Sequence, residues 1–316
     1  LEYDGAIIDT AIHFVLKTDK PQTNIDNLRE NVGESAVELL FRRYLSEKQI
    51  PHAMKSPVSF AAPDTYQVSL GGRRCIIVNR LVTRRNKISA FSQADNYLLN
   101  TDVVVLPGNQ KDYYHDDDLF IFTYLAGVVT RSQQDLQKAY DSGQPLSLFI
   151  SFPEKFSNPL TWGALGEIVL KADTTSPITI ILSGLNSARE KIQNEIVLSP
   201  KSRTSLSGNK YYALNYMGTS AIPYGRIGVH ASALGETVLI GQYQWGNLQI
   251  YGKRIYLAGY LSVGELEEKA RYLHYEDKLG HQNSPGKTLT FPLNHLHPLN
   301  KLFEKAVSWE ISKKNT

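Results

Sequence analysis

The sequence contains a single cysteine, Cys75, in 316 residues. One cysteine excludes an intramolecular disulfide and a zinc site built from four cysteines of one chain. It also favours a reducing compartment. No apolar run approaches the roughly 20 residues that span a bilayer. We therefore expect a cytoplasmic protein that does not enter a membrane.

An excess of charge of one sign is also lacking, because 34 basic residues against 31 acidic ones leave a net charge of only +3. This total does not by itself indicate a nucleic-acid binder, since local clustering decides such binding. The hydrophobic fraction of 42% excludes a disordered chain. The length is about twice that of a usual domain, which predicts two domains. We place them at residues 1–144 and 145–316, because Gly143 and Pro145 follow a predicted helix end.

The first half alternates between helical and strand-like patterns. Apolar spacing predicts a helix over about 25–48, and alternation predicts a strand over 66–70 that turns at Gly71-Gly72. The apolar run 74–82 is typical of a central strand. A helix over about 89–99 and a buried strand over 102–107 follow. This order predicts an α/β core.

The second half has more strand-like segments, including 178–182, 237–245 and 248–251, and helices over about 265–275 and 299–309 close the chain. These patterns predict that the second half is a mixed, strand-rich α/β domain. Two spacings typical of a capping box begin helices, one from Thr130 to Gln133 and one from Ser262 to Glu265.

Residues suited to metal-dependent phosphodiester cleavage occur between residues 34 and 97. Glu34 lies on a predicted helix, and Asp64 comes just before the predicted hairpin. Gln93 and Tyr97 are four residues apart on a helix, so they can point the same way. Such a site needs carboxylates that converge on a divalent cation and a positive surface for the phosphate backbone.

This order resembles the restriction-endonuclease-like family, the PD-(D/E)xK nucleases. In that family a helix Glu precedes a Pro-Asp at a strand, a (D/E)-x-K follows on the next strand, and one branch adds Gln-x-x-x-Tyr. The matching residues here are Glu34 or Glu38, Pro63-Asp64, the glycine turn, and Gln93 with Tyr97. The resemblance covers roughly residues 24–107. It implies a restriction-endonuclease-like core, a catalytic set of Glu34, Asp64, Gln93 and Tyr97, and magnesium held by Glu34 and Asp64.

The (D/E)-x-K position departs from the family pattern. It should fall on the strand through residues 75–80, where one register offers Ile76 and Val78 and the other Ile77 and Asn79. Neither register supplies the second carboxylate or the lysine. Asp64 would then hold a hard cation through too few oxygens, so we expect the fold without the family's usual catalysis.

A basic cluster between residues 73 and 87 contains no acidic residue. Its members are Arg73, Arg74, Arg80, Arg84, Arg85 and Lys87. Six cations in one strand and loop can neutralise phosphates, which predicts nucleic-acid binding that weakens with salt. The alternative is that some of them pair with Asp112, with Asp116 to Asp118, or with the helix glutamates.

These observations favour a DNA-associated protein with a restriction-endonuclease-like fold, an eroded metal site and no cofactor. One alternative is an active magnesium-dependent DNA endonuclease whose catalytic residues have migrated. Another is a protein-interaction scaffold that does not bind nucleic acid. A protein partner and a homo-oligomer are both left open.

Overall fold

The computed structural model describes residues 25–54, 67–93, 102–105, 114–206, 210–269, 271–273 and 288–314. The chain forms two compact units. Of the described residues, the sandwich unit contains 25–32 and 129–251, and the core unit contains 33–128 and 252–314. The fold is mixed α/β. None of the described helices is long and apolar enough to cross a membrane.

These units differ from the division that we predicted between residues 144 and 145. The reason is that strand β15 (Tyr251–Ser262) returns to the core unit, where it lies beside β5 (Leu119–Val128) in one sheet. Helix α8 (Leu299–Lys314) also packs in that unit. The sandwich unit is thus largely an insertion between β5 and β15.

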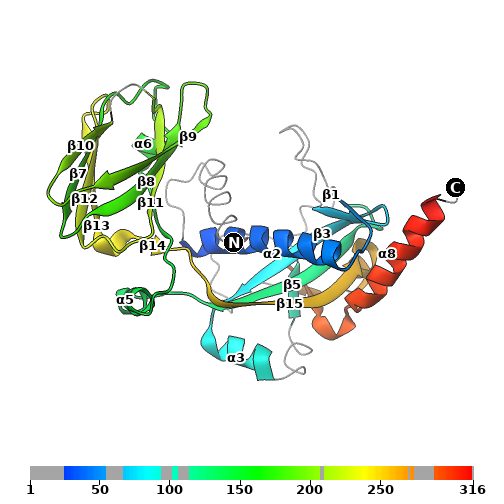
Figure 1. The fold of residues 1–316 in the computed structure, drawn as a ribbon. Helices are drawn as coiled ribbons and strands as arrows, with labels where there is room; N and C mark the ends of the chain where they lie inside the picture. Colours follow the sequence, from blue (N-terminus) through cyan, green and yellow to red (C-terminus); the bar gives the residue numbers. More distant parts are fainter. Residues whose placement is uncertain are drawn as a thin grey trace. The chain divides into compact units, whose positions relative to one another are not determined.

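The main sheet of the core unit has the strand order β1-β2-β3-β5-β15 (Figure 1). The first three strands are β1 (His52–Met54), β2 (Val68–Leu70) and β3 (Arg73–Val82). They pair antiparallel, whereas β3 and β5 run parallel. Helix α3 (Arg85–Gln93) lies between these two parallel strands in the chain.

Helices cover both faces of this sheet. On one face, Phe41 and Leu45 of α2 (Ile25–Glu47) pack with Leu302 of α8 against Cys75 and Ile121. On the other, a second cluster joins α3 and α7 (Val263–Lys269) to the sheet through Phe91, Phe120, Phe122 and Leu266. The core unit therefore has helix, sheet and helix layers.

The predicted hairpin is confirmed. Gly71 and Gly72 connect β2 to β3 and have φ angles of 57° and 88°, values that favour glycine. The predicted helix over 25–48 is also confirmed, since α2 ends at Glu47. The following helix begins at Arg85, earlier than the predicted residue 89.

The predicted strand over 102–107 is found at residues 102–105, in a sheet other than the main one. Strand β4 (Asp102–Val105) pairs with β17 (Thr288–Pro292), and β17 pairs with β16 (Arg271–Leu273) in a separate small sheet. The place beside β3 is taken by β5 instead. The short 3-10 helix η3 (Leu293–His295) precedes α8.

The sandwich unit consists of two antiparallel sheets around one apolar core. One sheet has the order β10-β7-β12-β13. Its strands are β7 (Ile168–Thr174), β10 (Arg203–Leu206), β12 (Gly225–Ala231) and β13 (Glu236–Gly241). Along β7, buried residues alternate with outward-facing ones, which is the pattern of a sheet with one covered face.

The other sheet has the order β14-β6-β11-β8-β9. Its strands are β6 (Leu148–Ser151), β8 (Ile178–Leu185), β9 (Lys191–Leu198), β11 (Ala213–Thr219) and β14 (Gly246–Asn247). The described residues of this unit also form α5 (Gln133–Asp141), α6 (Glu154–Ser157) and the 3-10 helix η2 (Gln242–Gln244).

Candidate nucleic-acid interface

The structure describes two of the four residues of the predicted catalytic set, Glu34 and Gln93. Glu34 is exposed on α2, and Gln93 is the last residue of α3. Asp64 and Tyr97 lie outside the described residues. The alternative helix glutamate, Glu38, forms an ion pair with Arg42 one turn further along α2.

The turn of α2 that carries Glu34 packs closely on the main sheet. A Cβ atom added to Gly33 would lie 3.1 Å from Leu125 Cδ2 and 3.6 Å from Asn79 Nδ2. Glycine thus permits the helix backbone to approach β3 and β5, which explains its position inside a long helix. Asn79 is the residue that one of the two possible registers places where the resemblance calls for a lysine.

The two registers of the (D/E)-x-K position face opposite layers. Ile76 and Val78 pack into the apolar cluster with α3, whereas Ile77 packs on the side of α2 and α8. Asn79 Oδ1 accepts a hydrogen bond from the Thr123 hydroxyl at 3.2 Å. In neither register does the strand carry a carboxylate. The side chains of residues 76 to 79 therefore contribute to the packing between the sheet and its helix layers.

Two members of the basic cluster are held by the acidic loop. Arg74 Nε donates to Asp118 Oδ1 at 2.7 Å, and Arg74 Nη2 contacts the second oxygen of the same carboxylate. Asp118 is only 3% exposed. Arg73 pairs with the exposed Asp117 at 2.6 Å and lies over the ring of Trp309. The alternative that we left open for this cluster thus applies to these two arginines.

The other four cations gather where β3 ends and α3 begins. We call Arg80, Arg84, Arg85 and Lys87 the β3 basic end. Arg84 and Arg85 are exposed, and Arg80 and Lys87 are half-buried. Within the described part of the chain, none of these four side chains has a hydrogen-bond or ion-pair partner.

The β3 basic end also lies at the amino terminus of α3, whose first turn contains no acidic residue. The peptide dipoles of a helix give this terminus a partial positive charge, so nearby cations are unfavourable there and anions are favourable. A helix start in general leaves backbone N–H groups without backbone partners; in α3 the Lys87 N–H bonds to Asn86 Oδ1 at 2.9 Å and the Ile88 N–H to the Arg84 carbonyl at 2.9 Å. The arrangement can therefore hold an anion such as a phosphate.

Metal-ligating side chains do not converge on one point in the part of the chain that the structure describes. Among the described residues, no group of three or more histidine, cysteine, aspartate or glutamate side chains is placed to hold a metal ion. His297 Nε2 donates a hydrogen bond to the Glu265 carboxylate oxygen Oε1 at 2.8 Å. Glu265 also bonds to Ser262 in the predicted capping box, which is confirmed.

Three of the described ionisable groups of the core unit have shifted pKa values: Cys75, Glu265, and Tyr114, whose pKa is raised by burial and by the nearby Asp118 carboxylate. Burial raises the pKa of Cys75 to about 12, which makes this buried thiol unreactive. Burial also acts to raise the pKa of Glu265. Hydrogen bonds from His297 and from the Ser262 amide and hydroxyl outweigh burial, and the pKa falls to about 2.

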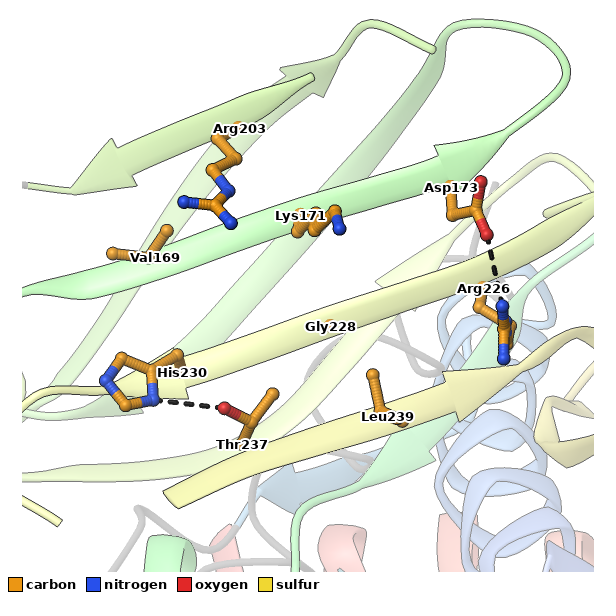
Figure 2. Close-up of a pocket in the computed structure, with 9 residues that line it drawn as sticks. All are labelled: Val169, Lys171, Asp173, Arg203, Arg226, Gly228, His230, Thr237 and Leu239. Atoms are coloured by element: carbon orange, nitrogen blue, oxygen red, sulfur yellow. Dashed lines mark hydrogen bonds and ion pairs between the residues drawn. The ribbon is translucent and has the colours of Figure 1, made fainter. Parts of the chain in front are cut away.

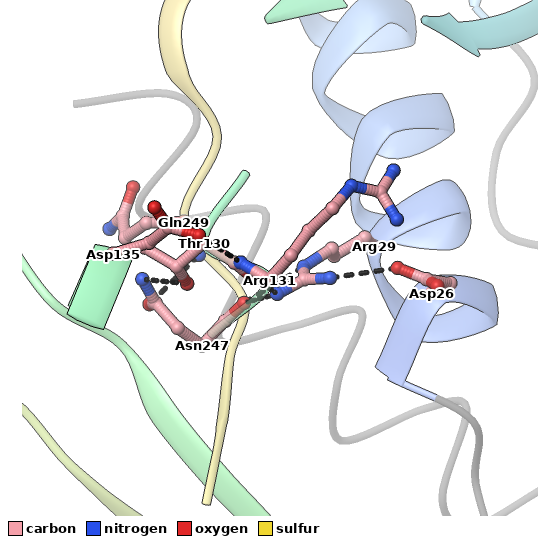
Figure 3. A network of polar contacts seen from close by, with 7 residues as sticks. All are labelled: Asp26, Arg29, Thr130, Arg131, Asp135, Asn247 and Gln249. Atoms are coloured by element: carbon pink, nitrogen blue, oxygen red, sulfur yellow. Dashed lines mark hydrogen bonds and ion pairs between the residues drawn. The ribbon is translucent and has the colours of Figure 1, made fainter. Parts of the chain in front are cut away.

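A buried arginine that the sequence analysis missed organises the sandwich unit (Figure 3). Arg29 is 4% exposed and donates to the Asn247 carbonyl from Nε at 2.8 Å and from Nη2 at 2.6 Å. Its Nη1 pairs with Asp26 at 2.7 Å, and Nη2 reaches the Thr130 carbonyl. The network joins α2 to the segments by which the chain enters and leaves this unit. A helical arginine among apolar residues gives no sequence signal for such a role.

No protein-family model matches the chain, and no curated protein or solved structure is significantly similar to it.

Proposed function

We propose that this protein binds DNA through the β3 basic end and that its metal-dependent nuclease site is eroded. The observation that carries the proposal is the gathering of four cations without described side-chain partners at the carboxyl end of a parallel strand. Open α/β sheets commonly bind ligands outside the carboxyl ends of their strands. Phosphate groups are the anions that fit this charge.

The electrostatics of the site favour a polyanion. Arg84, Arg85 and Lys87 repel one another and oppose the dipole of α3, so the free protein retains an unfavourable charge arrangement. A phosphate backbone relieves both effects and releases its own counterions on binding. Because arginine and lysine contacts to phosphate carry no base information, we expect binding with little sequence preference.

Erosion of the nuclease site is supported by the residues of β3. The helix α2, the hairpin β2–β3 and the helix α3 follow one another in the order that the resemblance implies. Yet one register presents the apolar Val78 where a lysine is expected and the other the neutral amide of Asn79, and neither side chain accepts a proton at neutral pH or supplies the charge that magnesium prefers. Asp64 would be left to bind the metal with Glu34 alone.

The test uses the full chain and linear or plasmid DNA with magnesium. We expect salt-sensitive binding without cleavage, and weaker binding to every sequence when Arg84→Glu and Arg85→Glu are combined. A matched control replaces a pair that is already neutralised, Arg73→Gln with Asp117→Asn, and should bind as the unaltered protein does.

Two outcomes would contradict the proposal. Magnesium-dependent cleavage that Asp64→Ala abolishes would instead identify an active endonuclease with migrated catalytic residues. Absence of DNA affinity even at low salt would leave the protein-interaction scaffold.

A further inference from the structure

The outer face of the sheet β10-β7-β12-β13 contains a hollow of about 400 Å³ (Figure 2). This volume lies within the usual range for small-molecule sites, roughly 300–1,000 Å³. The residues that line it are Val169, Lys171, Asp173, Arg203, Arg226, Gly228, His230, Thr237 and Leu239. All of them belong to the sandwich unit.

The strand register places two cations directly opposite each other. Arg203 of β10 pairs with Lys171 of β7, and Lys171 pairs in turn with Gly228 of β12. Figure 2 shows the Arg203 guanidinium extending toward the strand that carries Lys171. Like charges at opposed positions of an antiparallel pair destabilise the sheet. Neither side chain has an ion-pair partner among the residues that the structure describes.

The other charges of the hollow do not neutralise this pair. Its one carboxylate, Asp173, already pairs with Arg226 at 3.3 Å. His230 Nδ1 is engaged by the Thr237 hydroxyl at 3.1 Å, which leaves Nε2 for another partner. The hollow therefore has an excess of positive charge.

Gly228 forms the floor beside the two cations. A Cβ atom at this position would lie 3.4 Å from Leu239 Cδ2 and 3.9 Å from Lys171 Cβ, so the backbone would accept a side chain. Because Gly228 has no side chain, the space between the cations Arg203 and Lys171 and the residue Leu239, which is 63% exposed, stays open. The face thus offers an anion site next to an apolar wall.

We propose that this hollow binds a phosphate group between Arg203 and Lys171, with the rest of the ligand over Gly228 against Leu239. Arginine matches the paired oxygens of a phosphate through its planar fork, and lysine adds a point charge. The inference goes beyond the proposed function and does not depend on it, because none of these residues belongs to the core unit.

The test is calorimetric titration of the full chain with pyrophosphate as the probe, followed by a short single-stranded oligonucleotide. Pyrophosphate should bind with Kd below about 1 mM, and Arg203→Gln with Lys171→Gln should weaken it at least about tenfold. Gly228→Val fills the hollow without changing charge and should weaken binding by a similar factor. Lys138→Gln removes a cation from exposed α5 in the same unit and should leave Kd unchanged.

The two probes distinguish the sources of the phosphate. Pyrophosphate binding that the variants abolish supports a small phosphorylated ligand. Oligonucleotide binding alone, lost in the same variants, supports a nucleic-acid backbone as the source. Binding that survives both Gly228→Val and the double variant, or no binding of either probe, would overturn the proposal. Thermal unfolding of each variant shows that it is folded, and Arg84 and Arg85 variants test the separate DNA proposal.

Discussion

The Thr123 hydroxyl of β5 donates a hydrogen bond to Asn79 Oδ1 of β3 at 3.2 Å, across the parallel pair at the centre of the main sheet. Thr123 is 1% exposed, so this bond is part of the packing. We expect Asn79→Ala to lower the free energy of unfolding by about 1 kcal/mol, measured by urea denaturation. DNA affinity, measured by fluorescence anisotropy, should be unchanged. A large loss of affinity in a folded variant would instead place Asn79 in the binding site.

The Arg74–Asp118 ion pair should stabilise the core unit more than the neighbouring Arg73–Asp117 pair does. Asp118 is buried and also accepts from the His115 amide at 2.9 Å, so its charge has little access to water. We expect Asp118→Asn to lower the free energy of unfolding by about 2 kcal/mol. The matched control is Asp117→Asn, which removes the exposed partner of Arg73 and should have a much smaller effect. Equal effects in urea denaturation would contradict this ranking.

Glu265 should make stability depend on acid pH. Its pKa is lowered from 4.5 to about 2 in the folded protein, so folding is stabilised above pH 4.5 by the ionised carboxylate. That stabilisation is lost as the pH falls through about 2, because the folded state then takes up the proton as well. Urea denaturation should therefore show a difference between the unaltered protein and Glu265→Gln that is present at pH 6 and shrinks toward pH 2. Glu268→Gln, on the exposed side of the same helix, serves as the control.

Cys75 should react with thiol reagents only when the core unit opens. The side chain is fully buried, and with a pKa of about 12 the thiolate fraction at pH 8 is about one in ten thousand. We expect labelling of the native protein to be slower than that of the urea-unfolded chain by several orders of magnitude. Comparable rates in the two states would show that the strand β3 is open to solvent.

Local patterns predicted much of the core unit. The extent of α2, the glycine hairpin and the Ser262–Glu265 cap depend on residues close in sequence, and all are confirmed. The predicted N-cap of α5, Thr130, was wrong by two residues. Ser132, not Thr130, accepts from the helix amide, and Asn247 bonds to the Thr130 hydroxyl instead. A distant partner thus decided between two hydroxyls of similar local propensity.

Long-range pairing explains what the sequence did not reveal. The strand at 102–105 is apolar enough for a central position, but its partner, β17, is far along the chain, so the pattern could not assign its sheet. The same holds for the candidate site. The basic cluster was visible in the sequence, but its division into paired and unpaired members depends on an acidic loop more than forty residues away. Asp64 and Tyr97 remain predictions.

The most direct test of the central claim is the salt dependence of DNA binding. We expect a linear fall of log Kobs with log salt concentration, and a slope that Arg84→Gln with Arg85→Gln reduces in magnitude by about 2, because each neutralised phosphate contributes about 0.9. Arg73→Gln with Asp117→Asn should leave the slope as it is, since that arginine is already paired. An unchanged slope in the Arg84 and Arg85 variant would contradict binding through the β3 basic end.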